Sequence, residues 1–272
     1  MSGPGQAFRA LHEESGAFVI PNPWDIGSAR ILERLGFKAL ATTSAGMAFS
    51  LGLTDGTVSP EAVLDHCRML TAATPLPVSA DLEKGFGDDP RSVFETIEAA
   101  AAAGLAGCSI EDHTGRRRSP IFEKALAVER IEAAVDACKS LSEDFVLTAR
   151  CENLLWGRND LDDVIDRLQA YEAAGADVLY APALPDLDAI RTVCSALSKP
   201  VNVIMDTADA TYRIDELAEA GVKRISVGSA FAQLAYGSLV TAAREVSRSG
   251  SFNFTKDAMD YFELDAIFRD TS

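Results

Sequence analysis

The sequence predicts a (β/α)8 barrel of the TIM type, with an extra helix at its C-terminal end. Eight short, mostly apolar segments alternate with eight segments of helical character, and no linker divides the chain. Strands that are covered by helices on both faces of a parallel sheet have this apolar composition. The length of 272 residues also suits one barrel. We therefore expect a single domain over residues 1–272.

The expected elements follow one another in strict alternation. Strands are predicted at 18–22, 38–42, 77–81, 107–112, 144–150, 177–181, 200–204 and 223–228. Helices are predicted at 25–35, 59–72, 89–104, 127–139, 161–174, 186–197, 214–220 and 229–248, with the extra helix at 256–268. Asp25 and Ser59 are good helix caps, and Gly36 is a good helix stop. Residues 43–46, a long segment carrying Asp55, and residues 113–123 are expected to be loops.

Composition excludes several classes of function. The formal net charge of -16 argues against nucleic acid or an anionic membrane as a partner. No apolar run approaches the length of a membrane span, and residues 1–10 lack the apolar core of a secretory signal. The five cysteines show no CxxC spacing and the three histidines no zinc-ligand spacing. Reduced thiols and a cytoplasmic location are the expectation.

Two acids with i, i+2 spacing end the third expected strand. Asp81 and Glu83 can point the same way, because side chains alternate along a strand. A pair of carboxylates can hold a hard cation such as Mg2+, which keeps several of its waters. Gly85 and Gly87 let the backbone approach a ligand closely. A strand followed by a solvated polar loop is the alternative that this stretch alone leaves open.

The barrel prediction explains where polar residues gather. Active sites of this fold lie at the carboxyl ends of the strands. Residues at or near such ends are Ser44, Asp81, Glu83, Glu111, Asp112, Arg150, Glu152 and Asn202. Asp81, Glu83 and Glu111 could together hold Mg2+ or Mn2+, and Arg150 could bind a carboxylate through two nitrogens. A cation and an arginine suit a small oxyacid whose developing enolate needs stabilising.

These residues carry a resemblance that covers about 18–246. The matching motifs are Asn22-Pro-Trp-Asp-Ile-Gly-Ser-Ala-Arg30, Thr43-Ser-Ala-Gly46, Asp81-Leu-Glu83, Gly85-Phe-Gly87, Ile110-Glu-Asp112, Ala149-Arg150, Gly175-Ala-Asp177 and Pro200-Val-Asn-Val203. The chain resembles the isocitrate lyase/phosphoenolpyruvate mutase superfamily. The resemblance implies Mg2+ at Asp81, Glu83 and Glu111, and C–C or P–C bond chemistry through a pyruvate-like enolate. It also implies oxo-acid binding by Arg150 and the backbone of Ser44, Ala45 and Gly46, with Asp55 and Asn202 as further site residues.

The sequence also departs from the superfamily's patterns. Isocitrate and methylisocitrate lyases carry a Lys-Lys/Arg-Cys-Gly-His loop after the fourth strand, where this chain has Thr114-Gly-Arg-Arg-Arg-Ser-Pro120. The second metal-site acid is Glu83, where many relatives have Asp. The sixth strand ends in Ala181-Pro-Ala183, where methylisocitrate enzymes have a carboxylate. These differences leave the substrate open.

The function expected from the resemblance is a Mg2+-dependent C–C lyase or decarboxylase acting on a small 2-oxo or 2-hydroxy carboxylate. A phosphonopyruvate-type P–C bond enzyme and a non-catalytic oxyacid-binding barrel are the alternatives. The general acid or base is sought in the 111–123 loop, where His113 is one candidate and 116–118 could form a lid. In relatives, the C-terminal helix packs between subunits, so a homo-oligomer (dimer or tetramer) is expected.

Overall fold

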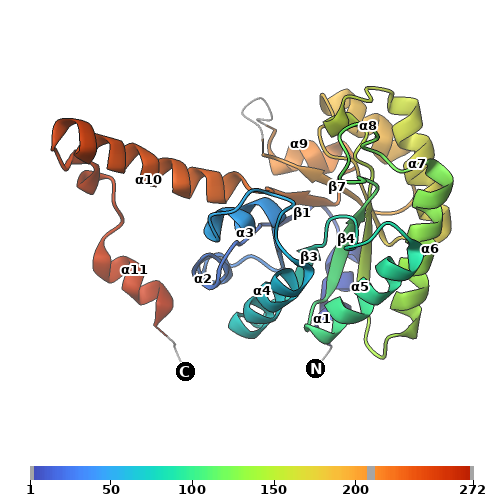
Figure 1. Ribbon diagram of the computed structural model, residues 1–272, viewed down its shortest axis with the longest axis horizontal. Coiled ribbons are helices and arrows are strands. Elements are labelled where there is room, and N and C mark those ends of the chain that lie inside the picture. Colours follow the sequence, from blue (N-terminus) through green and yellow to red (C-terminus); the bar gives the residue numbers. More distant parts are fainter. Residues whose placement is uncertain (1–2, 207–211, 270–272) are drawn as a thin grey trace.

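The strands form the predicted barrel (Figure 1). The computed structural model describes residues 3–206 and 212–269. Within them, eight parallel strands lie in the order β1-β8-β7-β6-β5-β4-β3-β2. They are β1 Phe18–Ile20, β2 Leu40–Ala41, β3 Val78–Asp81, β4 Gly107–Glu111, β5 Val146–Arg150, β6 Val178–Tyr180, β7 Val201–Ile204 and β8 Arg224–Ser226.

The helices lie outside the strands, largely where they were expected. They are α1 Pro4–Glu13, α2 Ile26–Arg34, α3 Ser44–Ser50, α4 Pro60–Ala73, α5 Pro90–Ala102, α6 Lys124–Ser140, α7 Leu161–Ala174, α8 Leu187–Ser195, α9 Ile214–Glu219, α10 Ala230–Ser249 and α11 Tyr261–Phe268. Two 3-10 turns, Leu154–Trp156 and Asn253–Lys256, complete the set. Both predicted caps are confirmed: Asp25 accepts from Ser28 N at 2.7 Å, and Ser59 accepts from Ala62 N at 3.3 Å.

Helix α1 was not predicted. It packs against the barrel near the amino-terminal ends of the strands, where Phe8 is fully buried. A Cβ on Gly5 would lie 1.6 Å from the carbonyl oxygen of Asp144, so only glycine allows this approach. Arg9 joins the helix to the strands through Asp144 at 2.8 Å and Asp177 at 2.6 Å. These contacts are long-range, so local sequence signals do not reveal them.

Asn22 helps to close the barrel between β8, β1 and β2. Its side-chain nitrogen donates to the carbonyl oxygen of Thr42 at 3.0 Å. Its side-chain oxygen accepts from the backbone N–H groups of Val227 at 2.9 Å and Gly228 at 3.0 Å. The backbone nitrogen of Ala41 also donates to the carbonyl oxygen of Pro21 at 3.0 Å. The Asn-Pro motif therefore has a structural use at the edge of the carboxyl end.

A buried arginine crosses the barrel interior below the strand ends. Arg224 donates to Asn202 Oδ1 at 2.8 Å and to Thr148 Oγ1 at 2.9 Å, and its third polar neighbour is His12 Nε2 at 3.4 Å. Among the described residues, no carboxylate forms an ion pair with Arg224, and burial lowers its pKa to about 10. The side chain of Asn202 is thus engaged inside the barrel, where it also donates to Ser226.

His12 should make the protein less stable in mild acid. Burial, followed by the nearby Arg224 cation, lowers the pKa of His12 to about 3. In the unfolded chain the pKa of His12 is about 6.5. Below that pH the unfolded state therefore binds a proton that the folded state does not bind. Stability should therefore fall as pH drops from about 6.5 towards 3, by up to about 1.4 kcal/mol per pH unit. Denaturant unfolding of wild type and His12→Gln at pH 7, 5 and 4 measures this. Parallel losses in both proteins would contradict the assignment.

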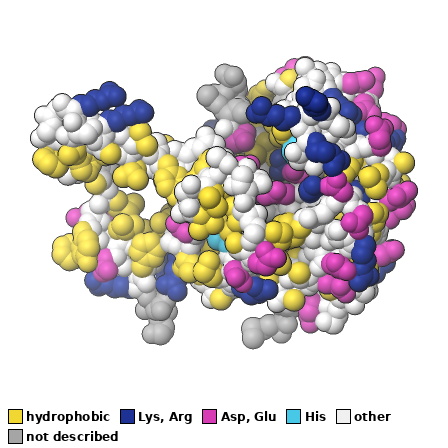
Figure 2. Space-filling model, in the orientation of Figure 1, with side chains coloured by type: hydrophobic (Ala, Val, Ile, Leu, Met, Phe, Trp, Pro, Cys, Tyr) yellow, Lys and Arg dark blue, Asp and Glu magenta, His cyan; other side chains and the backbone are white. Residues whose placement is uncertain are grey.

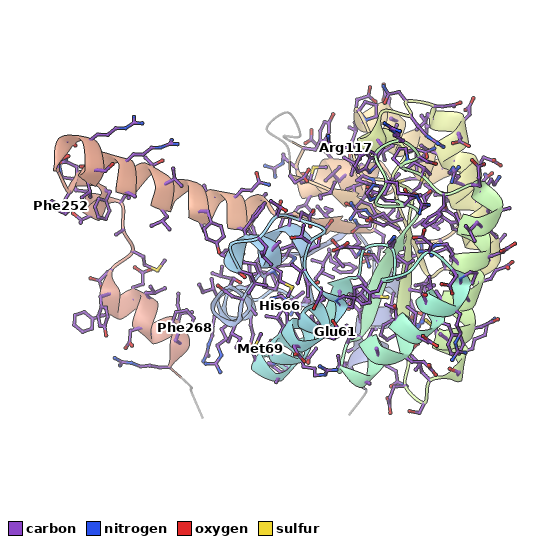
Figure 3. All side chains as sticks on the ribbon, in the orientation of Figure 1. Glu61, His66, Met69, Arg117, Phe252 and Phe268 are labelled. Carbon is purple, nitrogen blue, oxygen red and sulfur yellow. The ribbon has the colours of Figure 1, made fainter. Side chains whose placement is uncertain are left out.

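The helix that follows β8 leaves the barrel. Figure 1 shows α10 projecting away from the barrel and α11 coming back towards α2. We call residues 234–268 the arm; Phe252 lies at its far tip and Phe268 where it returns (Figure 3). Along α10 only Ala232 is buried, while Leu234 is 69% and Phe262 of α11 is 71% exposed. The space-filling view shows these apolar side chains gathered along the arm (Figure 2).

The end of the chain differs in detail from the prediction. The last helix was expected over 256–268, but α11 begins at Tyr261 after a 3-10 turn. Asp260 caps it by accepting from the backbone N–H groups of Phe262 and Glu263. None of the described helices is both long and apolar enough to cross a membrane.

Candidate active site

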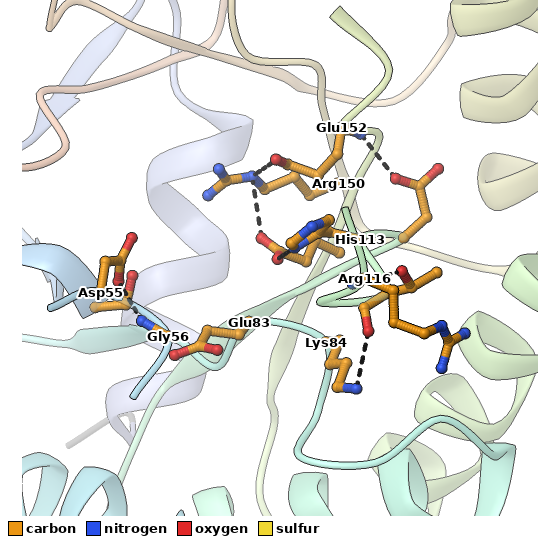
Figure 4. A network of polar contacts seen from close by, with 12 residues as sticks. Asp55, Gly56, Glu83, Lys84, His113, Arg116, Arg150 and Glu152 are labelled. Atoms are coloured by element: carbon orange, nitrogen blue, oxygen red, sulfur yellow. Dashed lines mark hydrogen bonds and ion pairs between the residues drawn. The ribbon is translucent and has the colours of Figure 1, made fainter. Parts of the chain in front are cut away.

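Six of the predicted site residues converge at the carboxyl end of β2–β5. A cavity of about 610 Å3 opens there, and Figure 4 shows its polar side chains. Its walls include Ser44, Asp55, Asp81, Glu83, Glu111 and Arg150, all of which the sequence had singled out. Its remaining polar walls include Lys84, His113 and Glu152. We call this cavity the acidic site.

Asp81 stands at the centre of one wall. Its carboxylate accepts from Ser44 Oγ at 3.1 Å and from the backbone nitrogen of Glu83 at 3.3 Å. Ser44 was expected in a loop, but it begins α3, which Thr43 caps by accepting from Gly46 N. A Cβ on Gly46 would lie 2.6 Å from Thr43 Cγ2, so the turn needs glycine. The early helix explains why Ser44 faces Asp81.

The loop after β3 has a strained backbone that a buried arginine holds. Glu83 has φ 50° and Phe86 has φ 60°, in the left-handed region that non-glycine residues seldom adopt. The Arg130 guanidinium donates to the carbonyl oxygens of Gly87 at 2.9 Å and Asp88 at 2.7 Å, and also to that of Lys84. Arg130 thereby fixes the loop that carries Glu83 into the acidic site.

Arg150 extends from β5 across the acidic site. It forms a short charge-assisted bond with Glu152, and its Nε lies 3.6 Å from Glu111 Oε2. Its Nη1 lies 3.9 Å from Asp81 Oδ2, and the guanidinium lies 5.0 Å from the centre of the Tyr180 ring. Burial alone would lower the pKa of Arg150, but Glu152 and the other nearby acids raise it well above its usual value. Arg150 is therefore a permanent cation.

The carboxyls of the site outnumber its cations. Burial, together with the charges of Asp81 and Asp55, raises the pKa of Glu83 to about 7. Burial and the charge of Glu152 raise the pKa of Glu111 well above its usual value. Lys84 offsets them only in part, because its Nζ binds Asp88 at 2.6 Å. The donor set is one that a hard divalent cation would stabilise.

The acids nevertheless do not form a closed metal cage. Among the described residues, no group of three His, Cys, Asp or Glu side chains is close enough to coordinate one ion directly. Mg2+ commonly binds through one or two carboxylates and retains several waters. Asp81, Glu83 and Glu111 fit a hydrated cation of this kind.

Comparison with known proteins agrees with this geometry. The family model described as phosphoenolpyruvate phosphomutase matches residues 8–247. The 2-methylisocitrate lyase of Salmonella typhimurium is 34% identical over 232 residues, which is 82% of this chain and 77% of that protein.

Solved structures agree as well. A Burkholderia cenocepacia protein described in general terms as a lyase/mutase is 54% identical, with a TM-score of 0.96 over 99% of this chain and 96% of that one. A 2,3-dimethylmalate lyase is 28% identical, with a TM-score of 0.87 over 98% of this chain and 95% of that one. This chain belongs to the isocitrate lyase/phosphoenolpyruvate mutase superfamily. It is an enzyme of the lyase class.

Asn202, which the superfamily motifs suggested, and Cys151, which they did not, both lie away from the mouth of the acidic site. Asn202 lies lower in the barrel, bound to Arg224 and Ser226. It borders a smaller cavity that also touches Asp81 and Arg150. Cys151 is fully buried, and burial raises the pKa of its thiol well above the usual value, so it is an unreactive neighbour.

The loop that carries the lyase cysteine in relatives is a short hairpin here. The backbone nitrogens of Thr114 and Phe122 donate to the carbonyl oxygens of Pro120 and Asp112 at 2.7 and 2.9 Å. Arg116 ties this hairpin to Asp88 in the loop after β3. The hairpin therefore stands beside the acidic site, and Arg117 lies on its outer side (Figure 3).

Three residues beside the acidic site are only weakly indicated by the sequence. His113 stacks on Trp156 with ring centres 4.2 Å apart, and its Nδ1 lies 3.5 Å from Glu111 Oε1. Its Nε2 is buried and has no hydrogen-bond partner. Glu152 lies two residues after Arg150, and its position near the end of the fifth predicted strand was the signal that indicated it. Trp156 comes from a 3-10 turn whose packing could not be predicted locally.

Asp112 points away from the acidic site into a buried network. It accepts from Glu152 N at 2.8 Å, from the Tyr171 hydroxyl at 2.7 Å and from Arg167 at 3.2 Å. We expect Asp112→Asn to lower the free energy of unfolding by about 3 kcal/mol, because Arg167 loses a buried anion. The melting temperature should fall by roughly 6–12 °C.

Asp163→Asn is the matched control for that change. Asp163 also binds Arg167, at 3.3 Å, but its side chain is 38% exposed, so its loss should cost no more than about 1 kcal/mol. Thermal unfolding of both variants tests the network. If Asp112→Asn melts within about 2 °C of wild type, its loss of unfolding free energy is no more than about 1 kcal/mol and the network is unimportant.

Proposed function

We propose that this enzyme is a Mg2+-dependent C–C bond lyase that acts on a small 2-oxo or 2-hydroxy carboxylate. The observation that supports it best is the acidic site itself, in which Arg150 faces Asp81, Glu83 and Glu111 at the carboxyl ends of neighbouring strands. Membership of the superfamily, whose relatives include 2-methylisocitrate lyase and 2,3-dimethylmalate lyase, supports the same reaction class. A decarboxylation would use the same groups.

The metal would be held by Asp81, Glu83 and Glu111, in part through water. When bound, Mg2+ (or Mn2+) would supply positive charge to the oxygen that becomes negative as the bond breaks. It would also relieve the repulsion that raises the pKa of Glu83. Binding would thus release protons near pH 7.

The chain's own residues would hold and orient the substrate. Arg150 would bind its carboxylate, since a guanidinium offers two parallel donors. Ser44 and the backbone of Ala45 would bind the oxyacid from the opposite side, whereas the backbone N–H of Gly46, which the superfamily motif also suggested, is taken by Thr43. The buried side chains of Arg150 and Glu152, which line the site, would keep water from the reacting carbon.

Proton transfer is required at two points. When a 2-hydroxy acid is cleaved, its hydroxyl loses a proton, C2 becomes a carbonyl carbon, and the electron pair of the C2–C3 bond remains on C3. C3 then takes up a proton. We assign this transfer to Asp55 and to a Glu111 that contacts the cation through water rather than directly; burial raises the pKa of both carboxyls. The superfamily's loop cysteine is not present to do it.

A turnover assay tests this function. The protein is purified, treated with EDTA, and assayed with 2-hydroxy dicarboxylates for release of a 2-oxo acid, with and without added Mg2+. We expect release only with Mg2+ or Mn2+. Phosphonopyruvate belongs in the panel, because the matching family model bears the name of a phosphomutase. Turnover of phosphonopyruvate alone would replace the C–C lyase with a P–C bond enzyme, and metal-independent release would contradict the metal's role.

We also propose that the enzyme is a homo-oligomer, a dimer or tetramer, in which the arm packs on a second copy of the chain. The arm exposes Leu234, Leu239, Phe252 and Phe262, more apolar surface than a free helix tolerates. We propose that residues 1–272 act as one domain. The free cysteines are what a reducing compartment such as the cytoplasm would maintain. Light scattering should show an oligomer that Leu239→Glu dissociates; a monomeric wild type would contradict this.

A further inference from the structure

A second cavity adjoins the acidic site on the far side of Arg150. Its volume is about 190 Å3, and it lies beyond the ends of β5, β6 and β7. Arg150 and Leu155 line both cavities, so the two spaces are neighbours across these side chains. A ligand whose carboxylate binds Arg150 can therefore place one part over the acids and another part in this second cavity.

The second cavity is mostly apolar, and Tyr212 is a lining residue that carries a neutral hydroxyl. Its walls include Leu155, Pro182, Leu184, Val203 and Met205. Among its described lining residues, Arg150 and Asp206 are the charged ones. Arg150 already faces Glu152, Glu111 and Asp81. Asp206 is the acidic group of this cavity, and burial raises its pKa. An additional carboxylate placed here would meet aliphatic walls and a like charge.

We propose that this cavity, the alkyl pocket, receives a short apolar substituent on the departing half of the substrate and rejects a third carboxylate. The inference rests on the proposed function and narrows its substrate class to dicarboxylates with a C3 alkyl group. The sequence Ala181-Pro-Ala183 after β6 contributes to it, because it brings no cation or hydrogen-bonding side chain to the pocket.

The size of the pocket limits that substituent. A dry apolar cavity of about 150 Å3 is known to bind benzene, and this one is slightly larger. A branched group of three to five carbons would therefore fit. Each buried methylene should raise kcat/KM roughly fourfold until the pocket is full.

A matched set of C3-substituted malates tests the proposal. The set is malate, 3-methylmalate, 3-isobutylmalate and isocitrate, whose carboxymethyl group has nearly the shape of isobutyl but carries a charge. Each compound is measured with Mg2+ for kcat/KM and for its dissociation constant by calorimetry. We expect a rise from malate to 3-isobutylmalate, and isocitrate at least about 30-fold weaker than 3-isobutylmalate.

Variants of the pocket sharpen the test. Met205→Glu should weaken 3-isobutylmalate at least about tenfold, while Met205→Leu, which preserves an apolar wall, should stay within about twofold of wild type. Asp206→Asn removes a charge of the same sign as the third carboxylate of isocitrate. Isocitrate should then bind several-fold better, and the affinity for 3-isobutylmalate should not change. A similar response of both ligands to Asp206→Asn would overturn the charge argument.

Oxalate separates this proposal from the function on which it rests. It is too short to enter the alkyl pocket when it occupies the acidic site, so its Mg2+-dependent binding reports on that site alone. If oxalate binds with Mg2+ but the malates show no dependence on alkyl length, or isocitrate is preferred, the alkyl pocket is wrong and the lyase function stands. If neither oxalate nor any malate binds with Mg2+, both proposals fail.

Discussion

Replacing Asp81 by asparagine should abolish most of the activity without destabilising the protein. The change keeps the shape of the side chain but removes a charge that the proposed metal needs, and we expect kcat/KM to fall at least about 1,000-fold. The metal-free protein should be as stable as wild type or more stable, because Glu83 and its neighbours lose a repelling charge.

Steady-state kinetics and thermal unfolding in EDTA check both halves of this expectation. Asp188→Asn is a suitable control, because Asp188 is an exposed α8 residue that pairs with its own helix neighbour Arg191. An Asp81→Asn enzyme that retained a tenth of wild-type kcat/KM would remove Asp81 from the site. A large fall in stability in EDTA would assign it a structural role instead.

Arg150 should be needed both for activity and for stability. Arg150→Met removes the cation that faces Glu111 and Glu152, and the Glu152 side chain is 4% exposed. A buried anion left without its partner costs about 3–5 kcal/mol, so the melting temperature should fall by roughly 6–20 °C. The loss of the carboxylate-binding group should lower kcat/KM at least about 1,000-fold.

The double variant Arg150→Met with Glu152→Gln separates these two effects. Because the unpaired charge is gone, it should regain most of the lost stability while remaining inactive. Unfolding curves and kcat/KM of the single and double variants decide the matter. Recovery of activity in the double variant would show that Arg150 only neutralises Glu152 and does not bind substrate.

Much of the barrel could be predicted because its signals are local. Apolar runs, caps such as Asp25 and stops such as Gly36 locate strands and helices without knowledge of the tertiary structure. The fold then brings strand ends together, so Asp81, Glu111 and Arg150 could be assigned to one mouth before their distances were known. The motifs of the superfamily added Asp55.

The features that escaped prediction depend on long-range packing. Helix α1 is held by Phe8 and Arg9 against distant strands. The amide of Asn202 is taken by Arg224, which the sequence does not mark as an interior residue. The alkyl pocket is assembled from two loops and a 3-10 turn, and no sequence spacing reports such a shape. The direction of the arm depends on tertiary contacts that local patterns do not encode.

The most direct test of the account is the linkage between Mg2+ and oxalate in a thermal unfolding experiment. Oxalate resembles the enolate of pyruvate, so the acidic site should bind it through the metal and Arg150. With Mg2+ present, oxalate at about 100 times its dissociation constant adds roughly 2.7 kcal/mol of stability and should raise the melting temperature by about a further 5–10 °C. Oxalate in EDTA should raise it by much less. An equal shift with and without Mg2+, or no shift with both, would contradict a metal-dependent oxyacid site.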